Sequence, residues 1–162
     1  MDDFDDFFHD TYPRARNVAY RILGDRPAAE DAAAEAFTRA LVSWSRLASS
    51  EHREVWVLRA TMNVAVDLRR RRHPDVFPSE PIEDAGEATV LRLTMAQALA
   101  ALPRRQREVI GLRYLVGMTE SQVADSLGLS VGSVKRHGHR ATERLRQRLG
   151  EDWRPGVADV AT

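Results

Sequence analysis

Two helix-start signals on either side of a single glycine constrain the fold of this chain more than any other feature. The run Thr119-Glu-Ser-Gln122 has the form of a capping box, in which each of the two outer side chains accepts a hydrogen bond from the other residue's backbone N–H. Gly128 can take the left-handed conformation that ends a helix, and Ser130 can cap a second one. The small Ala124 lets two helices cross closely. This spacing predicts a helix-turn-helix, a motif that reads DNA.

The second helix of this motif is predicted to have a buried face and an outward face. At about 100° per residue, apolar or small residues recur on one side, namely Val131, Val134, Gly138, Ala141, Leu145 and Leu149. The outward face and its flank carry polar side chains, namely Ser133, Lys135, Arg136, His139 and Arg140. These residue types at the start of a second helix suit the phosphates and base edges of a major groove. The alternative is a solvated charged face.

A supporting helix is predicted directly before the motif. Pro103 suits a helix start, and the helical pattern runs from there to Leu115. The residues expected in the core of this half are Met95, Leu99, Val109 and Leu112.

The first half of the chain is also predicted to be helical. Phe4, Phe7 and Phe8 form a short amphipathic start, and a helix continues from Arg14 to Leu23. Gly24 ends that helix, and Asp25 and Pro27 begin another that reaches about Leu47. Its expected apolar stripe is Ala33, Phe37, Ala40, Leu41 and Trp44. Its opposite surface carries Glu30, Asp31, Glu35 and Arg39, which form either a solvated face with a Glu35–Arg39 pair or an acidic ridge that docks on another protein.

A further helix is predicted over residues 53–72, after a polar stretch from Ser45 to His52. One face is expected in the core, with Val55, Leu58, Met62, Ala65 and Leu68. Another face carries Trp56, Arg59, Asn63, Asp67 and Arg70 and leads into the arginine run 69–72. Arginines neutralise phosphates, an aromatic ring stacks on an unpaired base and an amide reads a base edge, so this face is a candidate nucleic-acid surface. The alternatives are a tryptophan in the core and arginines that complement the helix dipole.

Opposite charges are separated along the chain although they cancel in total. The 162 residues hold 24 basic and 24 acidic side chains, but residues 89–150 carry eleven basic against four acidic. Residues 73–88 carry five acidic side chains, no basic ones and three prolines, which disfavour helix. We therefore expect an all-α protein of two small helical domains, 1–72 and 89–150, joined by a flexible acidic linker, 73–88, and followed by a short tail, 151–162.

The composition argues against several classes of protein. With no cysteine, the chain has no disulfide, thiolate metal site or cysteine nucleophile. Its apolar stretches are far shorter than the about 18 residues that a spanning helix needs, and its acidic start differs from a secretory signal, so we expect a cytoplasmic protein without membrane insertion. There is no phosphate-cradling glycine loop and no convergent His/carboxylate cluster, and His137 and His139 are poorly spaced for a metal. We expect no enzyme, no cofactor and no metal site.

At this point the chain resembles a known family in both halves. It is similar to region 4 of the extracytoplasmic-function sigma factors of bacterial RNA polymerase in the runs Ala101-Leu-Pro-Arg-Arg-Gln-Arg-Glu-Val-Ile-Gly-Leu-Arg-Tyr114, Gly117-Met-Thr-Glu-Ser-Gln-Val-Ala124 and Leu127-Gly-Leu-Ser-Val-Gly-Ser-Val-Lys135. It is similar to region 2 in the runs Ala29-Glu-Asp31, Glu35-Ala-Phe37 and Trp56-Val-Leu-Arg-Ala-Thr-Met-Asn63-Val-Ala-Val-Asp67. The two matches occur in the family's order with a linker between them.

The resemblance implies a partner for each surface. It implies docking on the β′ clamp helices of core RNA polymerase by Glu30, Asp31, Glu35 and Phe37, and a contact with the β flap. It implies recognition and melting of the promoter −10 element by Trp56, Arg59, Asn63, Asp67 and Arg70, with the loop Ser45 to His52. It implies reading of the −35 element by Ser133, Lys135, Arg136, His139 and Arg140. The implied partners are core polymerase and promoter DNA, and an anti-sigma factor is a further candidate.

Four residues depart from the family pattern. Ala34 stands where the family commonly has Gln in the docking segment, Gly138 stands where it has a core Leu, and Arg136 and His137 replace the usual Ser-Arg. Because glycine weakens a helix, the second helix of the motif either packs closer to its neighbour or frays beyond His137. The rival function is a stand-alone helix-turn-helix regulator that binds operators as a dimer, for which the sequence offers no dimerisation segment beyond the tail.

Overall fold

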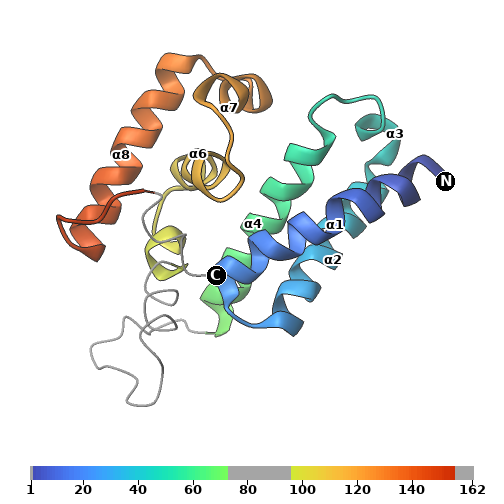
Figure 1. Ribbon diagram of the computed structural model, residues 1–162, viewed down its shortest axis with the longest axis horizontal. Helices are drawn as coiled ribbons and strands as arrows, with labels where there is room; N and C mark the ends of the chain where they lie inside the picture. Colours follow the sequence, from blue (N-terminus) through green and yellow to red (C-terminus); the bar gives the residue numbers. More distant parts are fainter. Residues whose placement is uncertain (1, 73–95, 156–162) are drawn as a thin grey trace.

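The computed structural model describes residues 2–72 and 96–155, and all regular structure in these ranges is helical. We call residues 2–72 the N-terminal unit and residues 96–155 the C-terminal unit (Figure 1). The N-terminal unit contains α1 (Asp2–Leu23), α2 (Arg26–Val42), α3 (Trp44–Leu47) and α4 (Arg53–Arg72). The C-terminal unit contains α6 (Arg104–Tyr114), α7 (Glu120–Leu127) and α8 (Val131–Leu149), and residues 96–100 before α6 are also helical. The predicted fold, two small all-α domains, is confirmed.

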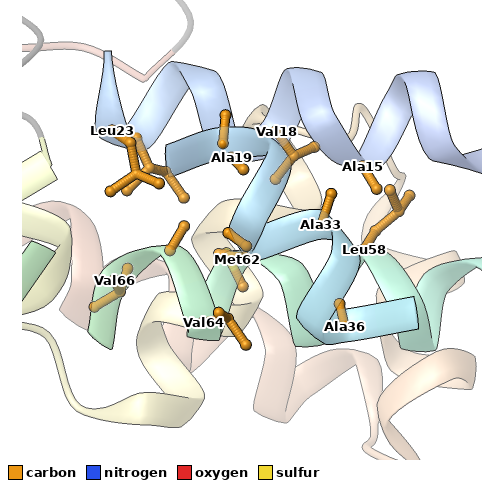
Figure 2. Close-up of a cluster of buried hydrophobic side chains, with 14 of the residues drawn as sticks. Ala15, Val18, Ala19, Leu23, Ala33, Ala36, Leu58, Met62, Val64 and Val66 are labelled. Carbon is orange, nitrogen blue, oxygen red and sulfur yellow. The ribbon is translucent and has the colours of Figure 1, made fainter. Parts of the chain in front are cut away.

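The core of the N-terminal unit lies where α1, α2 and α4 meet. Figure 2 shows its side chains pointing inward from the three helices. The buried face of α2 consists of alanines and one phenylalanine, namely Ala28, Ala29, Ala32, Ala33, Ala36, Phe37 and Ala40. Such small side chains let helix backbones approach closely, and the larger side chains of the neighbouring helices, such as Ile22, Leu58 and Met62, fill the space.

Aromatic rings close one end of this core. Phe37 lies within 6.4 Å, ring centre to ring centre, of the rings of Phe4, Phe7, Phe8 and Tyr12. This distance range suits edge-to-face and offset contacts between aromatic rings. Phe37, only 3% exposed, is therefore a core residue that holds α2 in place.

Three expectations about the first half are corrected by the structure. The phenylalanine segment and the helix from Arg14 form one helix that continues through Pro13. The next helix was predicted to reach about Leu47, but α2 ends at Val42 and the short α3 follows from Trp44 to Leu47, so the helix is interrupted at Ser43. Leu41 does not join the apolar stripe but is 52% exposed.

The helix-turn-helix of the C-terminal unit is confirmed in its capping details. Thr119 and Gln122 form the reciprocal capping box, and Gly128 ends α7 with a left-handed φ of 64°. The Ser130 side chain accepts a hydrogen bond from the Ser133 N–H at the start of α8. Val134 is buried as expected, but its neighbour on the predicted stripe, Val131, is 40% exposed.

The structure also bears on the predictions for the supporting helix and for Gly138 of α8. Pro103 directly precedes α6, and Leu99, Val109 and Leu112 are buried as predicted. Met95 and the expected linker 73–88 lie outside the described residues. Because α8 continues to Leu149, the idea that it frays beyond His137 is wrong.

The two units touch along α4 and α6, which lie side by side in the middle of Figure 1. A Cβ atom placed on Gly111 of α6 would overlap Sδ of the buried Met62 on α4, so the backbone of α6 approaches α4 as closely as it can. Leu115 and Val116, which follow α6, pack against the core of the N-terminal unit. The carbonyl groups of these two residues accept hydrogen bonds from Arg21 and Arg14 of α1, respectively.

Candidate nucleic-acid and partner-binding surfaces

The outward face of α8 places the five predicted DNA-reading residues together at the surface. Lys135, Arg136, His139 and Arg140 are exposed and Ser133 is half-buried. The buried side of the helix, with Val134, Ala141 and Leu145, fixes which way this face points. The face therefore has the charge and the access that contact with a duplex needs.

Weak local bonds hold some of these side chains. Arg136 Nη2 donates to Ser133 Oγ at 3.1 Å, and Ser133 Oγ also accepts from Ser130 Oγ at 2.9 Å. Lys135 Nζ lies 3.9 Å from a Glu120 carboxylate oxygen of α7. These exposed contacts are worth little in water, so phosphates can replace them at small cost.

The five predicted residues of α4 also lie on one helix, but their surroundings differ from those on α8. Trp56 is half-buried and packs against the core of the N-terminal unit, as the structural alternative for this tryptophan proposed. Asn63 and Arg59 lie under α6, and the Arg70 guanidinium donates to the carbonyl of Ala100 in the C-terminal unit. Asp67 is exposed, 4.0 Å from Arg70. The structure thus brings part of this face against the other unit.

Glu108 of α6 is the centre of this contact. It is 2% exposed, and its Oε1 accepts from Asn63 Nδ2 at 3.1 Å and lies 3.9 Å from Arg59 Nε. From its own helix, Arg104 Nε donates to Oε1 and Arg105 Nη1 to Oε2, each at 3.1 Å. One buried carboxylate thereby joins three guanidinium groups and an amide from both units, a set of charge-assisted bonds.

Arg107 completes the contact from the neighbouring position of α6. Its Nε donates to Asn63 Oδ1 at 3.3 Å, so both ends of the Asn63 amide are engaged by α6. Burial lowers the pKa of Arg107, and the nearby Arg70 charge lowers it further. Burial likewise lowers the pKa of Arg59, while the Glu108 charge raises it. Both groups stay charged at neutral pH because arginine starts from so high a value, so these directions report desolvation.

The arginine run at the end of α4 does not act as one surface. Arg69 is buried at 7% exposure, and burial lowers its pKa. Arg72 donates to Asp25 at the start of α2, at 3.5 Å. Arg70 is engaged by the C-terminal unit and Arg71 is exposed. Three of the four arginines are therefore buried or bonded within the chain.

The acidic ridge of α2 is at the surface. Asp31 and Glu35 are exposed and Glu30 is half-buried. The predicted Glu35–Arg39 pair is present, with Arg39 Nε 2.9 Å from Glu35 Oε1, and Arg16 of α1 lies 3.8 Å from Glu30. The ridge is thus partly neutralised by exposed ion pairs, which a partner's cations can exchange at small cost.

An exposed apolar end continues this ridge, which the sequence analysis did not identify. Val42 is 83% exposed and Leu41 52%. Val42 lies seven residues after Glu35, two helical turns further on the same face. Acidic side chains beside an apolar tip form a surface suited to a basic, partly apolar partner.

Two residues of the contact between the units were also missed. Glu108 and Gly111 were both part of a family-like run, but neither was given a role. Gly111 had a local signal, since a glycine inside a helix weakens it and often marks a close approach. Glu108 had none, because its partner Asn63 is 45 positions away in the chain.

Other kinds of site are not found in the residues that the structure describes. Within residues 2–72 and 96–155, no group of three or more His, Cys, Asp or Glu side chains is placed to hold a metal ion. No helix in these same ranges is both long and apolar enough to cross a membrane.

Comparison with known proteins covers both units. The family model "Sigma-70 region 2" matches residues 7–74, and "Sigma-70, region 4" matches residues 92–145. The ECF RNA polymerase sigma factor SigW of Bacillus subtilis is 30% identical over 82% of this chain and 81% of its own length. The ECF RNA polymerase sigma factor SigL of Mycobacterium tuberculosis is 32% identical, with the same two coverages of 82% and 81%.

A solved structure has the same fold. It is the sigma factor RpoE in complex with the anti-sigma factor NepR from Bartonella quintana. The match has a TM-score of 0.59 and 22% identity, and covers 94% of this chain and all of the other.

Proposed function

This chain belongs to the extracytoplasmic-function group of RNA polymerase sigma factors, and we propose that it directs the polymerase to promoters with three separate surfaces. Residues 1–72 act as sigma region 2 and residues 89–150 as sigma region 4. The acidic residues 73–88 connect them, and the tail 151–162 follows. As a specificity subunit, the chain does no catalysis of its own and works in the cytoplasm, where polymerase and DNA are.

Reading of the −35 element is assigned to α8. The observation that carries this proposal is the exposed polar face of Ser133, Lys135, Arg136, His139 and Arg140, on a helix whose start is fixed by the capped turn after α7. Cations beyond those needed for folding, on the second helix of a helix-turn-helix, match the electrostatic requirement of a duplex.

Docking on core polymerase is assigned to the acidic ridge of α2. Glu30, Asp31 and Glu35 offer carboxylates to the β′ clamp helices, and the exposed Val42 adds an apolar contact at one end. Phe37 contributes from inside the core by holding α2 in place. The C-terminal unit contacts the β flap.

Recognition and melting of the −10 element are assigned to α4. In this assignment the flipped bases and the single strand are contacted by Asn63, Arg59 and Asp67. The edges of the same face carry Arg70 and Trp56. Extruding a base costs a few kcal/mol, so contacts that recover this cost select sequence and favour melting together. An anti-sigma factor is a proposed regulator, since a relative of the same fold is bound to one.

The experiment that tests the function combines the purified chain with core polymerase on a promoter library and sequences the transcripts. We expect a defined set of start sites that share a −35 and a −10 element and are absent without the chain. The same start sites with and without the chain would contradict the proposal. A stand-alone regulator would instead bind duplex DNA as a dimer in the absence of polymerase.

A further inference from the structure

The face of α4 assigned to the −10 element is already occupied by the same chain. Both the Oδ1 and the Nδ2 atoms of Asn63 are hydrogen-bonded to α6, through Arg107 and Glu108. Arg59 lies at the same carboxylate, and Arg70 donates to the backbone before α6. These bonds use one of the two N–H donors and one of the two acceptor positions of the amide, so α6 takes up half of its hydrogen-bonding capacity.

We propose that the C-terminal unit inhibits its own chain by covering this face, and that Glu108 is the carboxylate that holds the two units together. The proposal rests on the assignment of the −10 element to α4. In this closed arrangement, the Glu108 side chain occupies the position against Arg59 and Asn63 that an anionic DNA strand occupies when the promoter is bound. The chain alone therefore withholds its −10 face until the polymerase separates the two units.

The charges at the contact show why the Glu108 carboxylate can hold the two units together. The contact brings together five arginines, namely Arg59, Arg70, Arg104, Arg105 and Arg107. It includes two carboxylates, of which Asp67 is exposed and Glu108 is buried. Without the Glu108 charge, the partly buried Arg59 of α4 would face the buried Arg107 and the more exposed Arg104 and Arg105 of α6 with no carboxylate between them. Like charges held close together repel, so the units should separate more often.

The same contact has features of one that opens. Arg107, which bonds Asn63 through its Nε atom, has its Nη1 atom buried without a hydrogen-bond partner among the described residues. Such an atom loses its water without recovering an equal bond, which lowers the stability of the closed arrangement. Leu115 and Val116 add apolar burial, and Gly111 fits closely against Met62. The contact is therefore specific, but its stability is lower than if every buried polar atom in it were hydrogen-bonded.

Glu108→Gln is the direct test, because it removes the charge and keeps the shape. Since the chain has no cysteine, dyes can be attached to Asn17→Cys on α1 and Gln147→Cys on α8, both exposed positions. Energy transfer between the dyes reports the distance between the units. Binding of a labelled single-stranded DNA pool of random sequence, without polymerase, reports access to α4. The control is Glu151→Gln, the same change at an exposed acid of the same unit.

We expect Glu108→Gln to lower energy transfer and to strengthen single-strand binding by up to about tenfold if the open form is a tenth of the wild-type population. The control should match the wild type in both. Unchanged energy transfer, or lower transfer without tighter binding, overturns the proposal. Neither readout involves transcription, so failure here is distinct from failure of the promoter experiment.

Gly111→Leu tests the same idea by shape. A leucine favours helix, but in the closed arrangement its Cβ would overlap Sδ of the buried Met62, so the Met62 side chain would have to move for α6 to stay on α4. We expect the same two changes as for Glu108→Gln, with helicity by circular dichroism unchanged. A folded Gly111→Leu chain that keeps wild-type energy transfer would overturn the close contact itself.

Discussion

α8 and α4 each carry arginines and other polar side chains on one face, and the two faces differ in what lies over them. On α8 four of the five proposed DNA-reading residues are exposed and make only weak contacts within their own unit. On α4 the amide and two arginines of the corresponding set are bonded to the other unit. Similar composition along a helix therefore does not mean similar access to DNA.

The difference follows from where each helix sits. One side of α8 packs on α6 and α7, and the opposite side has no neighbour among the described residues. α4 packs on α1 and α2 with one side and on α6 with another. A helix that is covered on two sides exposes more of its polar side chains when one neighbour leaves. We therefore propose that the chain itself can regulate access to the α4 face but not to the α8 face.

A disulfide that locks the closed arrangement should have the largest effect, and it should affect α4 without affecting α8. Met62→Cys with Gly111→Cys places two thiols on facing positions of α4 and α6, in a chain that has no other cysteine. When the disulfide is formed, we expect transcription from a chain-dependent promoter to fall by about two orders of magnitude or more, and to return after reduction. Binding of duplex −35 DNA should be equal in both redox states, because α8 is exposed in either.

The two single-cysteine variants are the controls for this lock. Each carries one of the changes in packing but cannot form the disulfide, so their transcription should be insensitive to oxidant. A locked chain that transcribes as well as the reduced one would show that α4 works while α6 covers it.

Arg136→Ala, on α8, should give the next largest effect. A contact to a base edge is worth about 1–3 kcal/mol, so duplex −35 affinity should fall about 10- to 100-fold, and a phosphate contact would lower the salt slope by about one. Arg148→Ala, an exposed arginine in the last turn of α8, is the control. Titrations at several salt concentrations measure both quantities. Equal losses for the two variants would mean a general charge effect.

Asn63→Ala should separate reading from inhibition on α4. It removes one inter-unit partner of Glu108, so the unbound chain should open somewhat more. It also removes a base reader, so promoter opening should slow by about tenfold, the value of one good contact, with closed-complex formation spared. Permanganate footprinting of melted bases over time measures the opening. Normal opening rates would remove Asn63 from the melting machinery.

The sequence predicted those parts of the fold that depend on neighbours within a turn or two. The capping box at Thr119, the left-handed Gly128 and the cap at Asp25 are formed by residues three or four positions apart, and all are present. Helical periodicity also separated polar from apolar faces in most places. Family resemblance, together with these local signals, was sufficient to expect two helical domains and a helix-turn-helix.

What the sequence did not predict depends on the partner that a face meets. Periodicity states that one side of α4 is polar, but not that Glu108, 45 positions later, lies against it. It placed Leu41 in the core because an apolar residue at the right angle is expected to be covered, whereas α2 ends one residue later and nothing described covers it. Long-range pairing and the ends of helices near their neighbours require coordinates.

Glu35→Lys should have a smaller effect and tests what uncovers α4. The change reverses a charge on the proposed docking ridge and removes the exposed Glu35–Arg39 ion pair. Such an exposed pair contributes at most about 1 kcal/mol to stability. We expect core-polymerase affinity to fall severalfold, to about a tenth, with folding intact. Glu51→Lys, at an exposed acid outside α2, is the control. Fluorescence titration with core polymerase gives the affinity, and an unchanged value would exclude the docking role of Glu35.

If core polymerase is what separates the units, the same titration should also report opening. Energy transfer between the dyes on α1 and α8 should fall as polymerase is added, and Glu35→Lys should need more polymerase to reach the same value. Full binding with unchanged energy transfer would mean that α6 stays on α4 in the holoenzyme.

The smallest effect should come from adding a methyl group at the two helical glycines that face a neighbour. At Gly138 on α8 the nearest atom to a new Cβ is Val109 Cγ1 at 3.8 Å, an ordinary contact, so Gly138→Ala should stabilise the C-terminal unit by about 1 kcal/mol through helix propensity. At Gly111 the new Cβ would overlap Met62 Sδ, so Gly111→Ala gains the same propensity but strains the closed contact. Thermal unfolding should rise by about 4–8 °C for the first variant, with energy transfer between the units unchanged. For the second variant energy transfer should fall, because a single methyl group on α6 is opposed only while α4 is beside it; equal behaviour of the two variants would mean that the contact between the units yields without cost.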